Sequence, residues 1–263
     1  MRFSNVLKFF KKSIPNKRNI LLIPGPVTTS QKVKDSMGVD IASREHKFID
    51  IIKNVQKNIL DIAKVSQKNY SCILLQGCGT YANESVIGSL PYDTKQLTLS
   101  NGIYGHRIHD IAKTINVNSR LIVCDAKEKI TVKNVEKNYL RESHISLVHH
   151  ETSNGIVNNV EEIVEWSKKK NIIVHIDGIS GLGGIPIEIE NLDIDYYVGS
   201  SNKCFNAFPG ISFVIAKKKT LELCKDFKRS LSLDLYGQYK EFELTEQFRF
   251  TPPPQIVSSL NTS

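Results

Sequence analysis

The sequence lacks any apolar run of the roughly 20 residues that a transmembrane helix needs, and it contains no internal repeat or low-complexity segment. Its five cysteines are odd in number and lack the paired spacing of zinc sites. These absences exclude a membrane-spanning chain and a metal site built from cysteine pairs. They predict reduced thiols in a reducing compartment, which we take to be the cytoplasm.

Acidic residues are also absent from the start of the chain, where the first is Asp35. Residues 1–18 therefore form a basic tail, which is either an organelle-targeting helix or a solvated extension. The net charge of +8 could suggest a nucleic-acid partner. However, other basic residues fall in short helical runs such as 168–170 and 217–219, without interleaved aromatic residues. That distribution predicts a solvated exterior, and neither nucleic acid nor a membrane as a partner.

Composition and length predict a soluble protein with one large domain. Hydrophobic residues make up 40% of the sequence and charged residues 24%, which are ordinary proportions for a globular fold. We expect this domain to span residues 19–250, and residues 251–263 to be the start of a truncated C-terminal region. An N-cap at 28–30 and helical periodicity over about 45–65 predict two helices before the first strand.

From residue 71 onward, short β-rich runs alternate with helical stretches. The expected strands are Cys72–Gln76, Gln96–Ser100, Arg120–Cys124, Ile145–His149, Ile172–Ile176, Asp195–Gly199 and Ile211–Ala216. The expected helices are Tyr81–Leu90, Gly105–Ile115, Val132–Leu140 and Val160–Lys169. This alternation predicts an α/β fold with a mostly parallel, seven-stranded mixed sheet and helices on both faces. Because the link between the last two strands is too short for a crossover helix, one of them is expected to be antiparallel.

Two loops that follow strands carry glycines. Gly77-Cys78-Gly79-Thr80 leads directly into a helix, so it is either a structural turn or a cradle for a phosphate at the helix N-terminus. Tyr104 lies between Gly102 and Gly105, and it either caps the sheet edge or stacks on a flat heterocycle.

Later strand ends carry a hydroxyl, a carboxylate and a lysine. Thr152 follows the adjacent histidines 149–150, which point to opposite faces of a strand and cannot easily share one metal ion. Asp177 ends a buried strand, where a carboxylate needs a partner such as a cation, and His175 either supports it or is a core residue. Lys203 follows Asp195–Gly199 and is either a surface charge or an amine able to bind an aldehyde.

These features converge at one edge of the expected sheet, because the carboxyl ends of parallel strands meet there. An anion cradle, a stacking ring, a buried acid and a lysine are the parts that a pyridoxal phosphate site requires. Their convergence favours the functional interpretation of Lys203 over a surface charge.

At these residues the chain resembles the fold-type I, class V aminotransferases, and within them the enzymes that act on 2-aminoethylphosphonate. The matching runs are Leu22–Thr29, Leu74–Thr80, Asn101–Gly105, Gly183–Pro186, Ser201–Cys204 and Arg229–Tyr236. The resemblance covers about residues 20–260, and the run 229–236 is its most specific part. It implies a transfer of the amino group of 2-aminoethylphosphonate to pyruvate, in phosphonate metabolism.

The resemblance also implies a role for each matching residue. Lys203 would hold pyridoxal 5'-phosphate covalently and then act as base and acid, while Asp177 would pair with the pyridine nitrogen. The other cofactor-binding residues would be Cys78, Gly79 and Thr80 at the phosphate, Tyr104 on the ring, Thr152 near the ring hydroxyl and Asn202 beside the lysine. In a homodimer with shared sites, Arg249 and Thr251 would reach the phosphate of the neighbouring subunit. Small-molecule amino donors and 2-oxo acids would be the other partners.

Two departures from the family pattern leave alternatives open. Family members continue past the position of Ser263 into a small domain whose arginine holds the substrate carboxylate, and Cys78 stands where serine is common. The chain could therefore be a fragment, or an inactive remnant that still binds the cofactor. A specificity of the alanine–glyoxylate or serine–pyruvate type is the nearest rival within the class, and a nucleotide-binding domain built on residues 77–80 is a further alternative.

Overall fold

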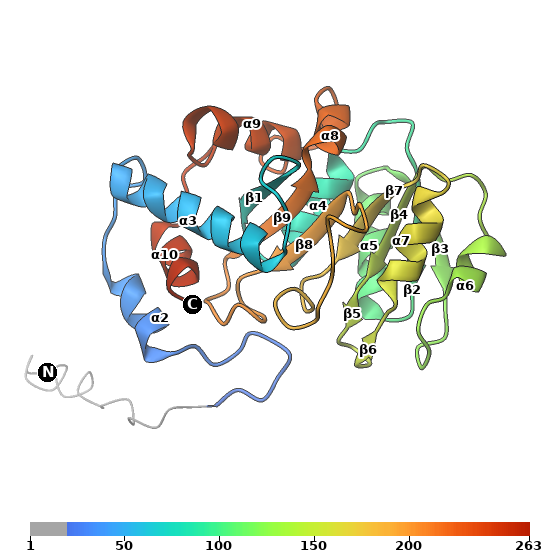
Figure 1. Cartoon of the computed structure of the whole chain (residues 1–263), viewed down its shortest axis with the longest axis horizontal. Coiled ribbons are helices and arrows are strands. Elements are labelled where there is room, and N and C mark those ends of the chain that lie inside the picture. Colours follow the sequence, from blue (N-terminus) through green and yellow to red (C-terminus); the bar gives the residue numbers. More distant parts are fainter. Residues whose placement is uncertain (1–19) are drawn as a thin grey trace, which may run out of the picture.

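The computed structural model describes residues 20–263, so the basic tail predicted at residues 1–18 lies outside the described residues. A seven-stranded sheet forms the centre of the molecule (Figure 1). In spatial order its strands are β1 (Tyr70–Gln76), β9 (Ile211–Lys217), β8 (Tyr196–Ser200), β7 (Ile173–Asp177), β4 (His144–Val148), β2 (Lys95–Ser100) and β3 (Asn118–Val123). The seven strands expected from the sequence are therefore all present.

Strand β9 is antiparallel to both of its neighbours, β1 and β8. The remaining pairs, from β8 through β7, β4 and β2 to β3, are parallel. The short link before β9 thus has the consequence expected from its length. Because all strands except β9 run the same way, the loops after β1, β2, β4, β7 and β8 open at one edge of the sheet.

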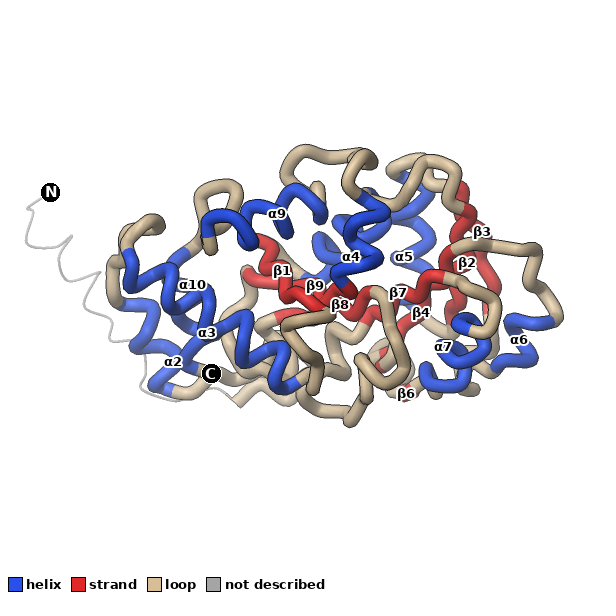
Figure 2. The backbone as a smooth tube through the Cα atoms, turned by 45° about the horizontal axis from the view of Figure 1, so that its top comes forward, coloured by secondary structure: helices blue, strands red, loops and turns tan. Residues whose placement is uncertain are grey.

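Helices cover both faces of the sheet (Figure 2). Helices α4 (Gly79–Gly88) and α5 (Ile103–Thr114) lie on one face, and α3 (His46–Ile62) and α7 (Val160–Lys168) lie on the other. Strands covered on both faces are apolar almost throughout, and β1 accordingly buries every residue except its last, Gln76. The predicted α/β layering is confirmed.

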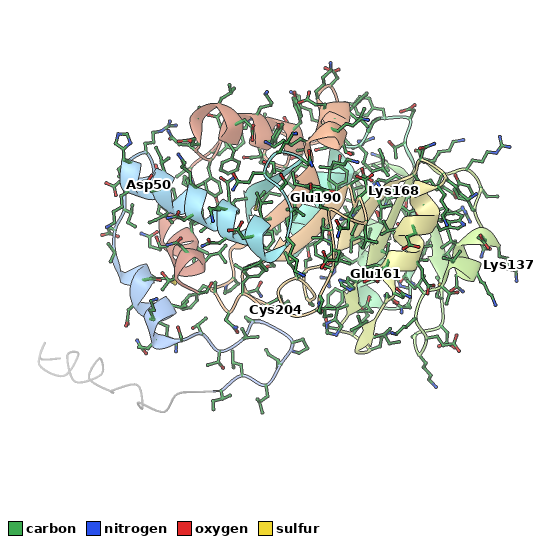
Figure 3. The ribbon with its side chains drawn as sticks, viewed as in Figure 1. Asp50, Lys137, Glu161, Lys168, Glu190 and Cys204 are labelled. Carbon is green, nitrogen blue, oxygen red and sulfur yellow. The ribbon has the colours of Figure 1, made fainter. Side chains whose placement is uncertain are left out.

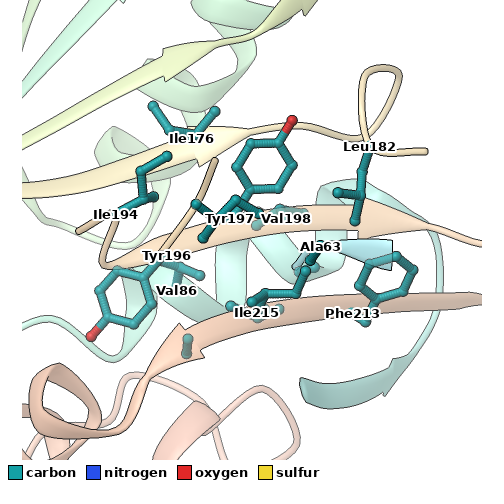
Figure 4. Close-up of a cluster of buried hydrophobic side chains, with 14 of the residues drawn as sticks. Ala63, Val86, Ile176, Leu182, Ile194, Tyr196, Tyr197, Val198, Phe213 and Ile215 are labelled. Carbon is teal, nitrogen blue, oxygen red and sulfur yellow. The ribbon is translucent and has the colours of Figure 1, made fainter. Parts of the chain in front are cut away.

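The core lies on both sides of the central strands. Figure 4 shows Tyr197 and Val198 of β8 beside Phe213 and Ile215 of β9, all of them buried. Gly199 leaves room for the Phe213 ring, since an added methyl group would lie 2.2 Å from a ring carbon. This packing holds β8 firmly, and with it the loop that carries Lys203.

The remaining elements lie at the ends and edges of the sheet. They are α2 (Gln31–Asp35), α6 (Val132–Glu136), the hairpin β5 (His150–Glu151) and β6 (Ile156–Val157), α8 (Lys218–Leu221), α9 (Leu235–Thr245) and α10 (Pro254–Thr262). Helix α6 ends four residues before the predicted Leu140, because Tyr139 leaves the helix to pack edge-to-face on Trp166. Helix α10 packs against α3, and the predicted domain boundary at residue 250 stays a prediction.

No helix among residues 20–263 has the length and apolar character needed to cross a bilayer. The same residues contain no cluster of histidine, cysteine and acidic side chains able to hold a metal ion.

Candidate functional site

A pocket opens at the edge of the sheet where the parallel strands end. Its cavity volume is about 180 Å³. Its lining residues are Cys78, Gly79, Thr80, Asn83, Tyr104, Arg107, Val148, His150, Asp177, Ile179, Ser180, Ser200, Asn202 and Lys203. We call it the Lys203 pocket. Most of the residues predicted from separate loops thus lie around one space.

Lys203 lies in the loop after β8, half-buried at the wall of the pocket. Two backbone bonds fix this loop: Ser201 N–H donates to Ile211 O at 3.0 Å, and Ala207 N–H donates to Ser201 O at 3.0 Å. Figure 3 labels Cys204, the next residue, on the same loop. The lysine is therefore held in place by the backbone around it, in a position to meet a molecule bound in the pocket.

Asp177 ends β7 and is only 5% exposed. Its Oδ2 accepts from Asn83 Nδ2 at 2.7 Å, and its Oδ1 accepts from the Ile179 N–H at 3.0 Å. Burial raises the pKa of Asp177 to about 6, although these two bonds oppose the rise. The partner expected from the sequence was a cation, but the direct partners in the structure are an amide and a backbone N–H.

The N-terminus of α4 faces the same pocket. Cys78 is its N-cap and makes no side-chain cap bond, so the first N–H groups of the helix are available to an anion. Gly79 lets Ile179 approach closely, because an added methyl group would lie 2.3 Å from Ile179 Cδ1 and would force that side chain to move. Together with Lys203 and Asp177, this end of α4 fits the phosphate, aldehyde and ring nitrogen of pyridoxal phosphate.

Tyr104 stands at the start of α5, half-buried, with the Arg107 guanidinium 4.9 Å from its ring centre. The backbone beneath it is fixed by Glu151, which is fully buried. One carboxylate oxygen of Glu151 accepts from the Tyr104 N–H at 3.1 Å and from the Gly105 N–H at 3.2 Å. A carboxylate at a helix N-terminus also matches the helix dipole.

Three predicted residues do not line the Lys203 pocket. Thr152 lies in the turn between β5 and β6, half-buried. Arg249 donates to Asp234 Oδ2 at 2.9 Å within its own chain. Thr251 lines a second pocket beside Gly77 and Tyr81. Asn202, by contrast, lies in the Lys203 pocket and accepts from the Ser200 hydroxyl at 2.6 Å.

Sequence reasoning missed other lining residues, chiefly Asn83, Arg107 and His150. Asn83 lies one helical turn after Gly79, so the periodicity of α4 could have placed it on the same face. His150 lines the pocket, and its Nδ1 is 3.3 Å from Ser180 O. The other adjacent histidine, His149, is buried, and its Nδ1 is 2.7 Å from the Tyr197 hydroxyl. His149 lies between β4 and β5, so the two histidines do not alternate along one strand as expected.

Comparison with protein families and curated proteins gives a consistent result. The family described as aminotransferase class-V matches residues 30–255. The 2-aminoethylphosphonate–pyruvate transaminase of Bacillus cytotoxicus is 36% identical over 247 residues, which are 92% of this chain and 68% of that protein. A bifunctional phosphonoacetaldehyde hydrolase/aminoethylphosphonate transaminase of Clostridioides difficile is 37% identical over 93% of this chain and 39% of its own length. The chain thus spans about two fifths of the bifunctional relative and about two thirds of the transaminase.

Solved structures share the fold. The alanine–glyoxylate aminotransferase of Nostoc superposes with a TM-score of 0.84 at 22% identity, covering 93% of this chain and 66% of that one. The predicted fold class is therefore confirmed.

Proposed function

The chain belongs to the class V aminotransferase family, and from that premise we propose that it is a pyridoxal phosphate-dependent transaminase. In this proposal it converts 2-aminoethylphosphonate and pyruvate to phosphonoacetaldehyde and alanine, in phosphonate metabolism. One observation carries the proposal: Lys203, Asp177 and the N-terminus of α4 line the same pocket.

Each of these groups has a defined task. The bound cofactor supplies an electron sink next to the reacting carbon. Lys203 Nζ would hold the cofactor and would move a proton from the substrate carbon. Asp177 would keep the ring nitrogen protonated through its carboxylate. The amides of Cys78 and Gly79 and the hydroxyl of Thr80, at the start of α4, would bind the phosphate.

The remaining assignments complete the site. Tyr104 stacks on the ring, with Arg107 against it. Asn202 lies beside the lysine, and Thr152 approaches the ring hydroxyl from the β5–β6 turn. The roles of Tyr104 and Asn202 are supported by their position in the lining of the Lys203 pocket. Thr152 is not part of that lining and would have to approach from outside it.

We further propose a homodimer with shared sites. Arg249 and Thr251 would then reach the phosphate of the neighbouring subunit from a surface that exposes apolar side chains, including Tyr81, Leu231 and Phe250 at 50%, 64% and 45%. Sedimentation of the full chain measures the oligomeric state, and a dimer is expected. Arg249→Ala should weaken cofactor binding although Lys203 is still present. A stable monomer that binds the cofactor normally would contradict the shared site.

The substrate rests on the curated relatives, whose names specify 2-aminoethylphosphonate. The rival is an alanine–glyoxylate type specificity, for which the Nostoc structure supports only the fold. No residue of the run 229–236 lines the Lys203 pocket. Arg229, the first residue of that run, donates to Leu90 O at 2.7 Å. Cytoplasmic location is part of the same proposal and is supported by five cysteines that are all free thiols.

Visible absorbance of the chain with added pyridoxal phosphate tests the function. A band is expected that is lost in Lys203→Ala and that shifts when 2-aminoethylphosphonate is added. A shift with alanine but not with 2-aminoethylphosphonate would favour the rival specificity. A band that responds to no amine would identify a cofactor-binding remnant. No band in the unsubstituted chain would refute the proposal.

A further inference from the structure

A buried chain of hydrogen bonds leads from Asp177 into the sheet. Asn83 of α4 contacts Asp177 on one side, and on the other side its Oδ1 lies 3.0 Å from His175 Nε2. His175 Nδ1 lies 3.1 Å from Ser146 Oγ, which accepts from Gln96 Nε2 at 3.2 Å. The four residues beyond Asp177 are 2% exposed or less. A polar chain this deeply buried is costly unless each bond is made.

Asp177 Oδ2, the oxygen that Asn83 contacts, determines the direction of every hydrogen bond in this chain. An ionised carboxylate only accepts, so Asn83 must present its Nδ2 to Asp177 and its Oδ1 to His175. His175 must then carry its hydrogen on Nε2. Burial lowers the pKa of His175 to about 3, so the ring is neutral and its Nδ1 accepts from the Ser146 hydroxyl.

The opposite direction is also possible, but only with a proton on Asp177. A protonated carboxyl would donate to Asn83 Oδ1, the Asn83 amide would turn over, and His175 would carry its hydrogen on Nδ1. The ionised form of Asp177 therefore fixes the tautomer of His175 through the Asn83 amide, whereas the protonated form allows either direction.

We propose that Asn83, locked by His175, is a positioning residue that keeps Asp177 ionised and oriented toward the pocket. This inference rests on the proposed function for its purpose, since an ionised Asp177 is what a pyridine nitrogen requires. Its structural content is independent of any cofactor: one amide couples a pocket carboxylate to a buried imidazole.

Other groups around Asp177 act on its ionisation but do not replace this contact. Glu151 disfavours the charge, while Arg107 and the Ile179 N–H favour it. Burial raises the pKa of the Tyr197 phenol, and the nearby charge of Asp177 raises it further. Lys203 shares the pocket. Of the neighbouring side chains among residues 20–263, Asn83 is the one that donates directly to the carboxylate.

Nuclear magnetic resonance on the cofactor-free chain tests the coupling. Labelled histidine reports the His175 tautomer, with its signals assigned by their loss in His175→Gln. Labelled aspartate reports the titration of Asp177. We expect the Nε2–H tautomer while Asp177 is ionised, because the carboxylate then fixes the Asn83 amide. Asn83→Leu should raise the proton affinity of Asp177 about tenfold or more, because a hydrogen bond to a charged group is lost.

Two further variants separate this role from general packing. His175→Gln can still donate to Asn83 and should leave the Asp177 titration within about twofold, whereas His175→Leu should raise its proton affinity. His144→Leu is the matched control. His144 is buried beside His175, but neither of its ring nitrogens has a hydrogen-bond partner among the described residues, so the Asp177 titration should not move. If Asn83→Leu does not fold, the Gln and Leu variants of His175 decide.

An Asp177 titration unchanged in Asn83→Leu and His175→Leu would overturn the proposal, as would Nδ1–H on His175 while Asp177 is ionised. The proposed function is tested separately by adding pyridoxal phosphate. A chain that shows the coupling but no visible band would refute the transaminase and leave the positioning role standing. In the loaded chain, Asn83→Leu should shift the pH midpoint of the band, which His144→Leu should not.

Discussion

Gly25 lies directly against the side chain of Lys203: a methyl group added at Gly25 would lie 2.5 Å from Cδ and 2.8 Å from Nζ. Gly25 belongs to the N-terminal strap, residues 20–29, which is otherwise largely exposed. The Leu21 N–H donates to Thr28 Oγ1 at 2.7 Å and closes the strap on itself. The strap therefore forms part of the surroundings of the lysine, although it is far from it in sequence.

Gly25→Ala should weaken binding of pyridoxal phosphate by at least about tenfold. The added methyl group must displace Lys203 or the strap, and overpacking of this kind costs about 1–3 kcal/mol. The backbone at Gly25, with φ of 146°, also disfavours alanine. Absorbance titration gives the dissociation constant.

Gly38→Ala is the control, because nothing lies within 4 Å of a methyl group added there. Its affinity for the cofactor should equal that of the unsubstituted chain. If Gly25→Ala also bound the cofactor normally, the contact between the strap and Lys203 would have no role in the site.

Glu151 should prove essential for the position of Tyr104. Glu151→Ala removes a buried carboxylate that accepts from the N–H groups of Tyr104 and Gly105. The loss leaves these two N–H donors unpaired, so the free energy of unfolding should fall by about 2–3 kcal/mol. Urea unfolding measures the change. Glu151→Gln keeps an acceptor and should lose clearly less, and equal losses in the two variants would argue against a role in holding α5.

The sequence predicted the strands of the sheet and the gathering of its loops, because both follow from local pattern. Apolar runs alternating with helical stretches require a covered, mostly parallel sheet, and that sheet brings Cys78, Asp177 and Lys203 to one edge. No long-range information is needed for this step.

The partners of these residues could not be predicted in the same way. Asn83 contacts Asp177 across 94 positions of sequence, and the packing of α4 against the sheet decides that contact. Gly25 contacts Lys203 only because the strap packs against the loop after β8. Arg249, expected to reach a neighbouring subunit, pairs with Asp234 in its own chain. Such contacts depend on packing, which local pattern does not encode.

Arg107→Met should weaken cofactor binding about two- to fivefold. The Arg107 guanidinium lies over the Tyr104 ring, and an exposed cation–π contact contributes about 0.5–1 kcal/mol. Arg107→Lys should retain part of the effect. Titration at low and high salt distinguishes this contact from a general attraction of the phosphate, which salt would screen more strongly.

Acid should destabilise the fold through its buried histidines. Burial lowers the pKa of His149 to about 4 and of His175 to about 3, and that of His144 well below its ordinary value. The unfolded chain therefore binds more protons as pH falls below about 6.5, and the stability present above that pH is lost. Asp177 acts oppositely: its pKa is raised from 3.8 to about 6, so its contribution is present below 3.8 and lost as pH rises through 6. The three histidines outweigh it.

His144→Leu should therefore stabilise the fold and flatten its dependence on pH. Neither ring nitrogen of His144 has a partner among residues 20–263, and replacing such a group with an apolar side chain should add about 1–2 kcal/mol at pH 7.5. The advantage should widen as pH falls toward 4.5, because the unfolded variant has one fewer proton to bind. Urea unfolding across this range measures both effects, with His46→Leu as a control at an exposed histidine. A variant whose stability runs parallel to that of the unsubstituted chain across this range would show that His144 binds a proton equally well in the folded and unfolded chains, which would contradict the effect of burial on its pKa.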